Sequence, residues 1–285
     1  MKALIVGGRG QLGRGLAATS PAGTCIVSHD LDTLDITDAS SVRAMIRVER
    51  PDLLFNAAAY TAVDKAEGDE SAAYEVNAVA VGILADAARA IGARFVHIST
   101  DFVFDGTSGI PYAPTAPTNP LSAYGRTKLA GEKRAGEDAL IVRTAWVYAP
   151  IGANFVRTMI RLMGERPQIR VVADQIGTPT YAPGLAAALW SLAGQERIGL
   201  YHYTDSGVAS WYDFAVAIQE EALAAGLLER AVPVVPISSA AFPTPARRPQ
   251  YSVLDKSSTF EALGGAAPHW RSNLRVLIGE ISTNG

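Results

Sequence analysis

Short apolar runs alternate with longer amphipathic segments along the first half of the chain. The runs are predicted to be strands, because each spans only a few residues and stops at glycine or polar residues. The amphipathic segments are predicted to be helices, since their apolar residues recur at every third or fourth position. The predicted strands are 3–6, 25–28, 53–55, 95–98 and 140–142, and the predicted helices are 11–19, one that Thr37 caps, and 71–90.

The fold class that follows is α/β. Strands that alternate with helices form right-handed crossovers and a mostly parallel sheet covered on both faces, which is a Rossmann-type doubly wound sheet. The second half reads differently, because prolines interrupt it and only the helical patterns at 181–192 and 211–225 remain. A smaller, mixed C-terminal substrate domain is therefore expected. The predicted division is 1–149 with 170–198 for the dinucleotide-binding domain, and 150–169 with 199–285 for the smaller one.

Composition narrows the class of protein. The chain has 285 residues, 48% of them hydrophobic and 19% charged, so it can bury a sizeable core. A net charge of -3 gives no reason to expect nucleic acid or an anionic membrane as a partner. Cys25 is the single cysteine, so no disulfide forms within the chain, and it is expected to be a small core residue. No apolar stretch has the length of a signal-peptide core or a membrane span. These features predict a cytoplasmic protein.

A glycine-rich loop, VGGRGQLG, follows the first predicted strand and opens a helix. Gly7 permits a tight turn, Gly10 lets the backbone approach a pyrophosphate, and Gly13 lets the helix pack close to the strand. Phosphates would then bind at the free amide groups of the helix. Asp30, past the second strand, stands where an acid binds an adenosine ribose. Glycine triplets alone also occur at ordinary turns, but this combination predicts a nucleotide site.

Other stretches are expected to line the same cleft. Asp35 and Ile36 lie where the adenine would bind, and Ala59, Tyr60 and Thr61 follow the third strand. Ligands of doubly wound folds bind at this carboxyl edge of the sheet. The alternative for the alanines around Ala59 is close packing against a helix.

A Thr–Asp pair and a Tyr–Lys pair supply candidate chemistry. Thr100 and Asp101 follow the fourth strand, and Tyr124 and Lys128 lie four positions apart at the start of the next helix, hence on one helix face. A neighbouring ammonium is expected to lower the pKa of the phenol, and a threonine hydroxyl can hydrogen-bond a carbonyl oxygen. Together they would polarise a ketone and protonate it beside a nicotinamide. Such a Tyr–Lys pair also occurs on plain helix surfaces.

The motifs resemble a known family. The glycine loop with Tyr-x-x-x-Lys is similar to the extended short-chain dehydrogenases/reductases. In order along the chain, the segments resemble the dTDP-4-dehydrorhamnose reductase family, from residue 7 to residue 249. These segments are GGRGQLG, NAAAYTAVDKAE, STDFVFDG, YGRTKLAGE, RTAWVY, DQIGTPT and PTPARRP.

The resemblance implies reduction of the 4-keto group of dTDP-4-dehydro-6-deoxy-L-mannose to dTDP-L-rhamnose with NADH or NADPH. It implies a catalytic set of Thr100, Tyr124 and Lys128. It implies that the cofactor is held by Gly7, Gly10, Gln11, Leu12, Gly13, Asp30, Asp35, Ile36, Ala59, Tyr60, Thr61, Tyr124 and Lys128. Asp101 and Trp146 would contact the sugar nucleotide, and Arg247 or Arg248 would meet its diphosphate. The alternatives are a core aromatic at Trp146 and surface arginines.

Two other functions remain open on the sequence. One is a nucleotide-sugar epimerase or dehydratase of the same fold, which keeps a tightly bound NAD. The other is a non-catalytic regulatory subunit resembling that of methionine adenosyltransferase. The four histidines do not cluster at metal-ligand spacing, so no protein metal site is predicted. Family analogy brings in Mg²⁺ and a monomer or a homodimer, but Arg14 and Gly15 stand where a bridging acid would be needed.

Cofactor preference is also open. The carboxylate of Asp30 would accept a hydrogen bond from the ribose of NADH and repel the 2′-phosphate of NADPH. Arg9 could bind that phosphate, and His29 could assist if protonated. Use of both cofactors with a mild preference for NADH is expected.

Overall fold

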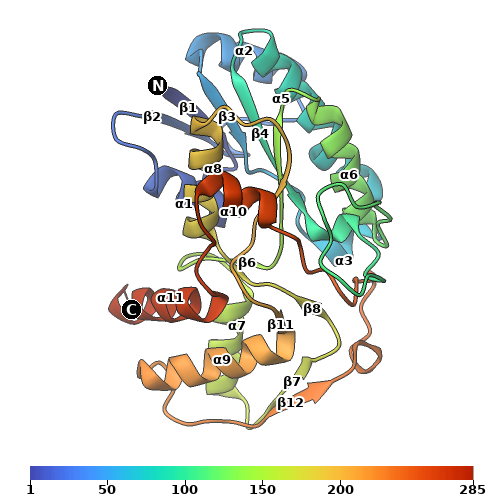
Figure 1. The fold of residues 1–285 in the computed structure, drawn as a ribbon, viewed down its shortest axis with the longest axis vertical. Helices are drawn as coiled ribbons and strands as arrows, with labels where there is room; N and C mark the ends of the chain where they lie inside the picture. Colours follow the sequence, from blue (N-terminus) through green and yellow to red (C-terminus); the bar gives the residue numbers. More distant parts are fainter. Residues whose placement is uncertain (285) are drawn as a thin grey trace.

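The computed structural model describes residues 1–284, and a six-stranded parallel sheet forms its centre (Figure 1). The strand order is β10-β5-β4-β3-β1-β2, and every neighbouring pair is parallel. The order reverses between β1 and β3, which is the switch point where ligands of such sheets bind. The strands are β1 (Lys2–Val6), β2 (Cys25–His29), β3 (Leu53–Asn56), β4 (Arg94–Thr100), β5 (Leu140–Thr144) and β10 (Gly199–His202).

Helices cover both faces of this sheet, as the sequence predicts. On one face α1 (Gln11–Ala18) packs against α8 (Ala182–Gly194), and on the other α2 (Ala39–Glu49), α5 (Ala80–Arg89) and α6 (Ala123–Ala135) lie side by side. Successive strand residues point to opposite faces, so Ile5 joins the core under α1 and α8 while Leu4 joins the core under α2 and α5. The Rossmann-type prediction is confirmed.

Two predicted helices differ in detail. The helix expected after Thr37 begins at Ala39 and is capped by Asp38, whose carboxylate accepts a hydrogen bond from the backbone of Ser40. Asp and Thr both cap helices, so the sequence could not separate the neighbours. The helix expected over 71–90 is three elements, α4 (Glu70–Tyr74), a π-helical turn η1 (Glu75–Val79) and α5.

The buried side chain of Asn77 occupies this π-helical turn. Its Oδ1 accepts a hydrogen bond from the backbone N–H of Tyr60 at 2.9 Å, and its Nδ2 donates to the backbone oxygen of Tyr60 at 3.1 Å. The same Nδ2 donates to the hydroxyl of Thr127 on α6 at 3.1 Å. One amide group therefore joins the loop after β3 to α6.

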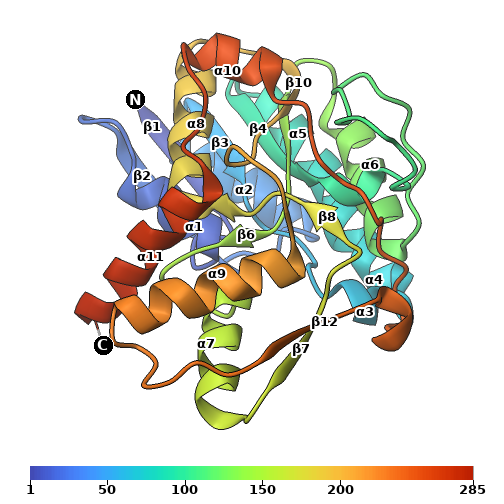
Figure 2. The same cartoon turned by 60° about the horizontal axis from the view of Figure 1, so that its bottom comes forward.

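Several segments of the second half of the chain form a smaller unit below the sheet, whereas α8 and β10 belong to the sheet layer (Figure 1; Figure 2). In it α9 (Trp211–Ala224) lies between α7 (Phe155–Glu165) and α11 (Trp270–Asn284), and β7 (Ile169–Val172) pairs with β12 (Val234–Ile237). A separate apolar core around Phe214 holds these elements together. The remaining elements are α3 (Val63–Ala66), η2 (Asp101–Val103), β6 (Val147–Tyr148), β8 (Ile176–Gly177), β9 (Thr180–Tyr181), β11 (Ala209–Ser210), η3 (Ser239–Ala241) and α10 (Ser257–Leu263).

Two strands belong to the other unit than the one expected. The expected division was 1–149 with 170–198 for one unit and 150–169 with 199–285 for the other. The strand β7 was assigned mostly to the dinucleotide-binding part, but it pairs with β12 in the smaller unit. The strand β10 was assigned to the smaller part, but it pairs with β5 at the edge of the central sheet. Both strands are only four residues long, and so short a run does not show which sheet it joins.

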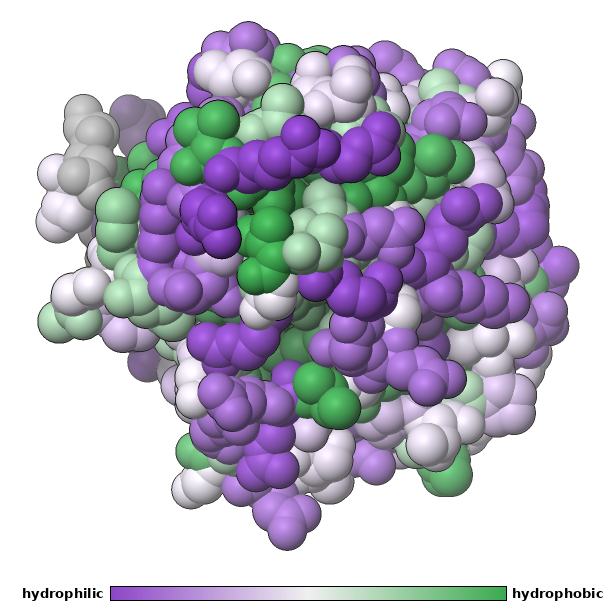
Figure 3. All heavy atoms as spheres, turned by 90° about the horizontal axis from the view of Figure 1, so that it is seen from above, coloured by the Kyte–Doolittle hydropathy of each residue, from purple (hydrophilic) through white to green (hydrophobic). Residues whose placement is uncertain are grey.

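Cys25 is exposed, so the prediction of a core residue is wrong. It begins β2, which is the edge strand of the sheet and is covered less than the central strands. Viewed from above, the molecule presents mainly hydrophilic side chains with small hydrophobic patches among them (Figure 3). Within residues 1–284 no helix has the length and hydropathy to span a bilayer.

Candidate active site

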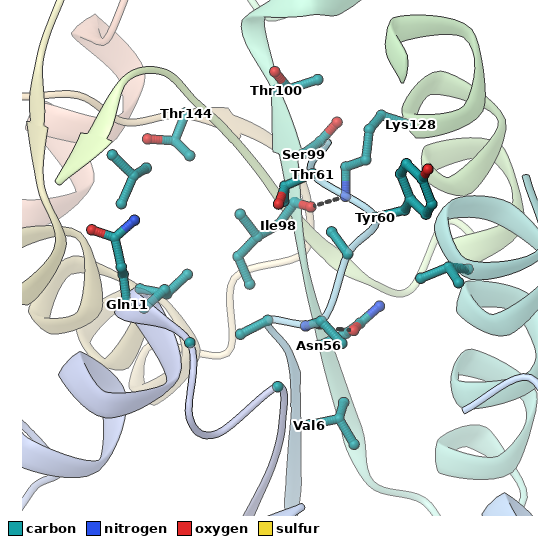
Figure 4. Close-up of a pocket in the computed structure, with 18 of the residues that line it drawn as sticks. Val6, Gln11, Asn56, Tyr60, Thr61, Ile98, Ser99, Thr100, Lys128 and Thr144 are labelled. Carbon is teal, nitrogen blue, oxygen red and sulfur yellow. Dashed lines mark hydrogen bonds between the residues drawn. The ribbon is translucent and has the colours of Figure 1, made fainter. Parts of the chain in front are cut away.

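A cleft of about 960 Å³ opens at the carboxyl edge of the central sheet and extends to the smaller unit. It brings together predicted residues from seven separate stretches of the sequence. Figure 4 shows several of them around the end of β4. The predicted residues that line the cleft are Gly7, Gly10, Gln11, Leu12, Asp30, Asp35, Ile36, Ala59, Tyr60, Thr61, Thr100, Asp101, Tyr124, Lys128 and Trp146.

The glycine loop has the shape of a phosphate cradle. Gly7 has a φ of 79°, and a Cβ there would lie 2.6 Å from the backbone nitrogen of Ala58. Gly13 does not line the cleft; a Cβ there would lie 2.2 Å from the carbonyl oxygen of Gly7, so it permits the close packing of α1. Gly10 caps α1 without a side-chain hydrogen bond, which leaves the first-turn N–H groups free for an anion. These residues fit a dinucleotide pyrophosphate.

The end of the cleft beside β2 carries charged side chains, which are Arg9, Asp30 and Asp32. The Oδ2 of Asp30 accepts a hydrogen bond from the backbone N–H of Arg9 at 2.9 Å, and its Oδ1 accepts one from the N–H of Leu31 at 2.9 Å. The bond from Arg9 is the main reason that the pKa of Asp30 lies below its ordinary value. The guanidinium of Arg9 forms an ion pair with Asp32. The acid therefore fastens the glycine loop to the end of β2.

Thr100, Tyr124 and Lys128 meet at the carboxyl end of β4. Thr100 is the last residue of β4, and Ser122 caps α6 by accepting a hydrogen bond from the backbone of Gly125. This cap starts the helix one residue before Tyr124, so the phenol and the ammonium of Lys128 share its cleft-facing side. The ammonium donates a hydrogen bond to the carbonyl oxygen of Ile98 at 2.6 Å (Figure 4).

Protonation in this corner differs from one expectation. Burial raises the pKa of Tyr124 to about 12, although a hydrogen bond with Thr100 acts in the opposite direction. The expected lowering of this pKa by Lys128 is wrong, because burial of the phenol outweighs the effects that favour the phenolate. Burial lowers the pKa of Lys128 to about 8, and the charge of Glu132 opposes that effect. A protonated phenol is nevertheless the form that can give a proton to a ketone.

Asp101 is buried beside this group. The Thr100 hydroxyl donates a hydrogen bond to its Oδ1 at 3.1 Å, while its Oδ2 has no hydrogen-bond partner. Burial raises the pKa of Asp101 to about 6. Its unpartnered oxygen is suited to accept a hydroxyl group of a ligand.

Trp146 is a cleft residue as well as a packed one. Its ring stacks on Trp211 with centroids 3.6 Å apart and planes 11° apart, and both residues line the cleft. Its backbone has a φ of 48°, and its indole lies against Gly177, where a Cβ would come within 2.9 Å of the ring. The sequence did not single out Trp211 as a site residue, since it also reads as the first residue of a helix.

Of the two adjacent arginines, Arg248 and not Arg247 lines the cleft. Arg247 is exposed and lines a separate groove beside Asp105, so the substrate-site assignment of Arg247 is not supported by its position. Arg248 forms an ion pair with Asp64 at 2.8 Å. A second cavity of about 640 Å³ adjoins the cleft, and the two share Trp211 and Arg248.

The described residues 1–284 contain no group of three or more His, Cys, Asp or Glu side chains that could hold a metal ion. Two of the four histidines are buried at different places. His97 hydrogen-bonds Asn56 at 3.2 Å, and His202 lies 3.5 Å from Arg143. These rings, His97 on β4 and His202 on β10, pack and form hydrogen bonds within the folded chain.

Comparisons with known proteins agree with this geometry. The family model described as the RmlD substrate binding domain matches residues 1–283. A dTDP-4-dehydrorhamnose reductase of Burkholderia thailandensis is 44% identical over 99% of both chains. The chain belongs to the dTDP-4-dehydrorhamnose reductase family. Membership covers both the sheet and the smaller unit, because the match spans nearly the whole chain.

Solved structures of the family have the same fold. A dTDP-4-dehydrorhamnose reductase of Clostridium acetobutylicum superposes with a TM-score of 0.92, at 40% identity and 98% coverage of each chain. The enzyme of Bacillus anthracis, solved in complex with NADP, gives a TM-score of 0.91 at 37% identity and covers 97% of this chain and 98% of its own. A UDP-glucose 4-epimerase of Thermus thermophilus shares only the fold, at 22% identity.

Proposed function

We propose that the protein reduces the 4-keto group of dTDP-4-dehydrorhamnose with NADPH or NADH, giving dTDP-L-rhamnose for polysaccharide synthesis. The observation that carries this proposal is the convergence of Thr100, Tyr124 and Lys128 in the cleft that begins at the glycine loop. Family membership over the full chain supports the same activity. A bound reduced nicotinamide would supply the hydride for C4 of the sugar.

Three side chains would then protonate, bind or lie beside the ketone oxygen. The Tyr124 hydroxyl, protonated at neutral pH, gives its proton to that oxygen as C4 becomes an alcohol carbon. The Thr100 hydroxyl, which donates to Asp101 in this structure, would turn to donate its one hydrogen bond to the same oxygen and hold it in place. The Lys128 ammonium lies on the same helix face, where it would donate hydrogen bonds to the ribose of the nicotinamide nucleotide. Solvent returns the proton to Tyr124 before the next turnover.

The rest of the substrate would extend toward the smaller unit. Asp101 would accept a sugar hydroxyl, since its Oδ2 is buried and unpartnered. Trp146 would contact the sugar nucleotide with the ring face opposite Trp211. Arg248 would bind the diphosphate in place of Arg247, because it lies in the cleft and presents a guanidinium.

Turnover tests this function directly. Purified protein with NADPH or NADH should oxidise the cofactor only when dTDP-4-dehydrorhamnose is present, with dTDP-glucose as the matched control. An epimerase or dehydratase would instead carry NAD through gel filtration and return it unchanged. Binding of the sugar nucleotide without any turnover would contradict the reductase and favour a regulatory subunit. The expected partner is this small molecule; a cytoplasmic location and a monomer or homodimer remain predictions.

Cofactor preference should respond to Asp30. Replacing Asp30 with alanine is expected to move the kcat/KM ratio toward NADPH by roughly fivefold, because a carboxylate about 4 Å from a phosphate costs about 1 kcal/mol in water. The ratio is measured for both cofactors in the wild type and the variant. Asp32→Ala is the companion variant, since it frees the guanidinium of Arg9 and should move the ratio the same way. An unchanged ratio in both variants would show that neither acid faces the ribose.

A further inference from the structure

A buried ion pair lies beneath the helix that carries Tyr124 and Lys128. The side chains of Glu132 on α6 and Arg143 on β5 are 7% and 3% exposed. They join through two parallel hydrogen bonds, from Nε to Oε1 at 2.8 Å and from Nη2 to Oε2 at 2.7 Å. The hydroxyl of Ser99 on β4 also donates to Oε1, at 2.5 Å. A carboxylate with three such bonds is held in one position.

The sheet register brings these partners together at the catalytic end. Ser99 and Arg143 are paired residues of the parallel strands β4 and β5, so their side chains leave the same face side by side. Ser99 directly precedes Thr100. Glu132 lies one helical turn beyond Lys128 on the same helix face. The carboxylate therefore connects the strand of one predicted catalytic residue to the helix of the other two.

Arg143 is itself fixed on its far side. Its guanidinium lies 5.0 Å from the ring centre of Phe104, and its Nη1 donates to the carbonyl oxygen of Pro114 at 3.3 Å. The Nε2 of His202 is 3.5 Å from the same nitrogen. Burial, and next the charge of Arg143, lower the pKa of His202 to about 3, so the ring is neutral and adds no competing charge.

We propose that Glu132, held by Arg143 and Ser99, is a positioning residue for the reduction: it fixes α6 against β4 and keeps the ammonium of Lys128 charged under the cofactor site. This inference rests on the proposed function of Lys128. Ser99 lines the cleft, but Glu132 and Arg143 do not. Glu132 therefore acts through Lys128 and not by touching a ligand.

The charge of Glu132 should affect the protonation of Lys128, which a role in packing alone would not. The titratable groups facing this corner are His97 on β4, Asp101 in η2, Tyr124 and Glu132 on α6, and Arg143 on β5. Burial, and next the charge of Lys128, hold the pKa of His97 well below its ordinary value, so it is neutral. The charged residues of α4, η1 and α5 are exposed: Glu70, Glu75, Asp86 and Arg89. Glu132 therefore supplies the anion that opposes the lowered pKa of Lys128.

The Glu132→Gln variant tests the proposal, because it keeps the shape and removes the charge. Without that anion the ammonium loses its proton at lower pH, so the alkaline limb of the kcat/KM profile should move down by about one pH unit. The affinity for NADPH, measured by fluorescence without the sugar, should weaken with rising pH along the same shifted curve. Glu132→Asp keeps the charge and should leave the limb near its wild-type position.

The matched control is Glu70→Gln. It breaks the exposed ion pair between Glu70 on α4 and Arg126 on α6, and it should leave both pH profiles unchanged. A Glu132→Gln variant with a lower melting temperature but wild-type pH profiles would overturn the proposal. If that variant does not fold, Ser99→Ala decides, because it leaves the ion pair intact. It should lower kcat about tenfold with little change in KM; wild-type kcat would overturn the proposal. Lack of turnover in the wild type defeats the reductase function, whereas the NADPH curves still test the role of Glu132.

Discussion

Replacing Tyr124 with phenylalanine is expected to lower kcat by about 10²–10⁴-fold while leaving the affinity for NADPH nearly unchanged. The phenol of Tyr124 lines the cleft and keeps its proton at neutral pH, and a positioned general acid contributes an effect of this size. Its aromatic ring would remain packed edge-on against Phe102, with centroids 5.6 Å apart, so the fold should persist. Steady-state kinetics with both cofactors and a fluorescence titration of NADPH measure the two quantities.

Tyr60→Phe is the matched control for this variant. It removes a hydroxyl group from the same cleft, but from the loop after β3 and not from α6. It should change kcat by no more than a few-fold. A Tyr124→Phe enzyme that turns over at a near wild-type rate would mean that the proton comes from another group, and Asp101 would be the next candidate because it lies beside Thr100.

Replacing Arg143 with methionine should destabilise the protein by about 3–5 kcal/mol, because it leaves the buried carboxylate of Glu132 without its cation. Urea unfolding followed by circular dichroism, in the absence of cofactor, measures the change. The double variant Glu132→Gln with Arg143→Met removes both charges, so it should recover a large part of the loss.

An exposed ion pair between α4 and α6 sets the scale for comparison. Arg126 and Glu70 form an ion pair at 2.7 Å with about half of each side chain exposed. Arg126→Met should therefore cost no more than about 1 kcal/mol. Equal losses for Arg126→Met and Arg143→Met would contradict the view that burial makes the second pair important.

Most of the cleft residues could be predicted from the spacing of residues that are close together in the sequence. Three glycines at a strand–helix junction and a Tyr–Lys pair at i, i+4 are local patterns, and parallel strands bring their carboxyl ends to one edge. For that reason Gly10, Thr100, Tyr124 and Lys128 could be expected in a single cleft, where the structure places them. Their catalytic and binding roles stay predictions until the variants above are measured.

Features that depend on distant contacts were missed. The sequence analysis did not single out Glu132 or Arg143, because no local pattern pairs them and only the packing of α6 against the sheet buries them together. In the irregular loop no periodicity tells which of Arg247 and Arg248 turns inward; the ion pair with Asp64, far away in sequence, decides it. Cys25 was assigned to the core because small apolar side chains usually are, but its strand lies at the edge of the sheet.

The π-helical turn at Glu75–Val79 has a consequence for how this sequence can change. A π turn arises from one extra residue in an α-helix, so removing a single residue there would restore regular helix and rotate everything before it by about 100°. Asn77 could then no longer hold both Tyr60 and Thr127. A one-residue deletion at this turn would therefore separate the loop after β3 from α6, although Asn77 itself does not line the cleft.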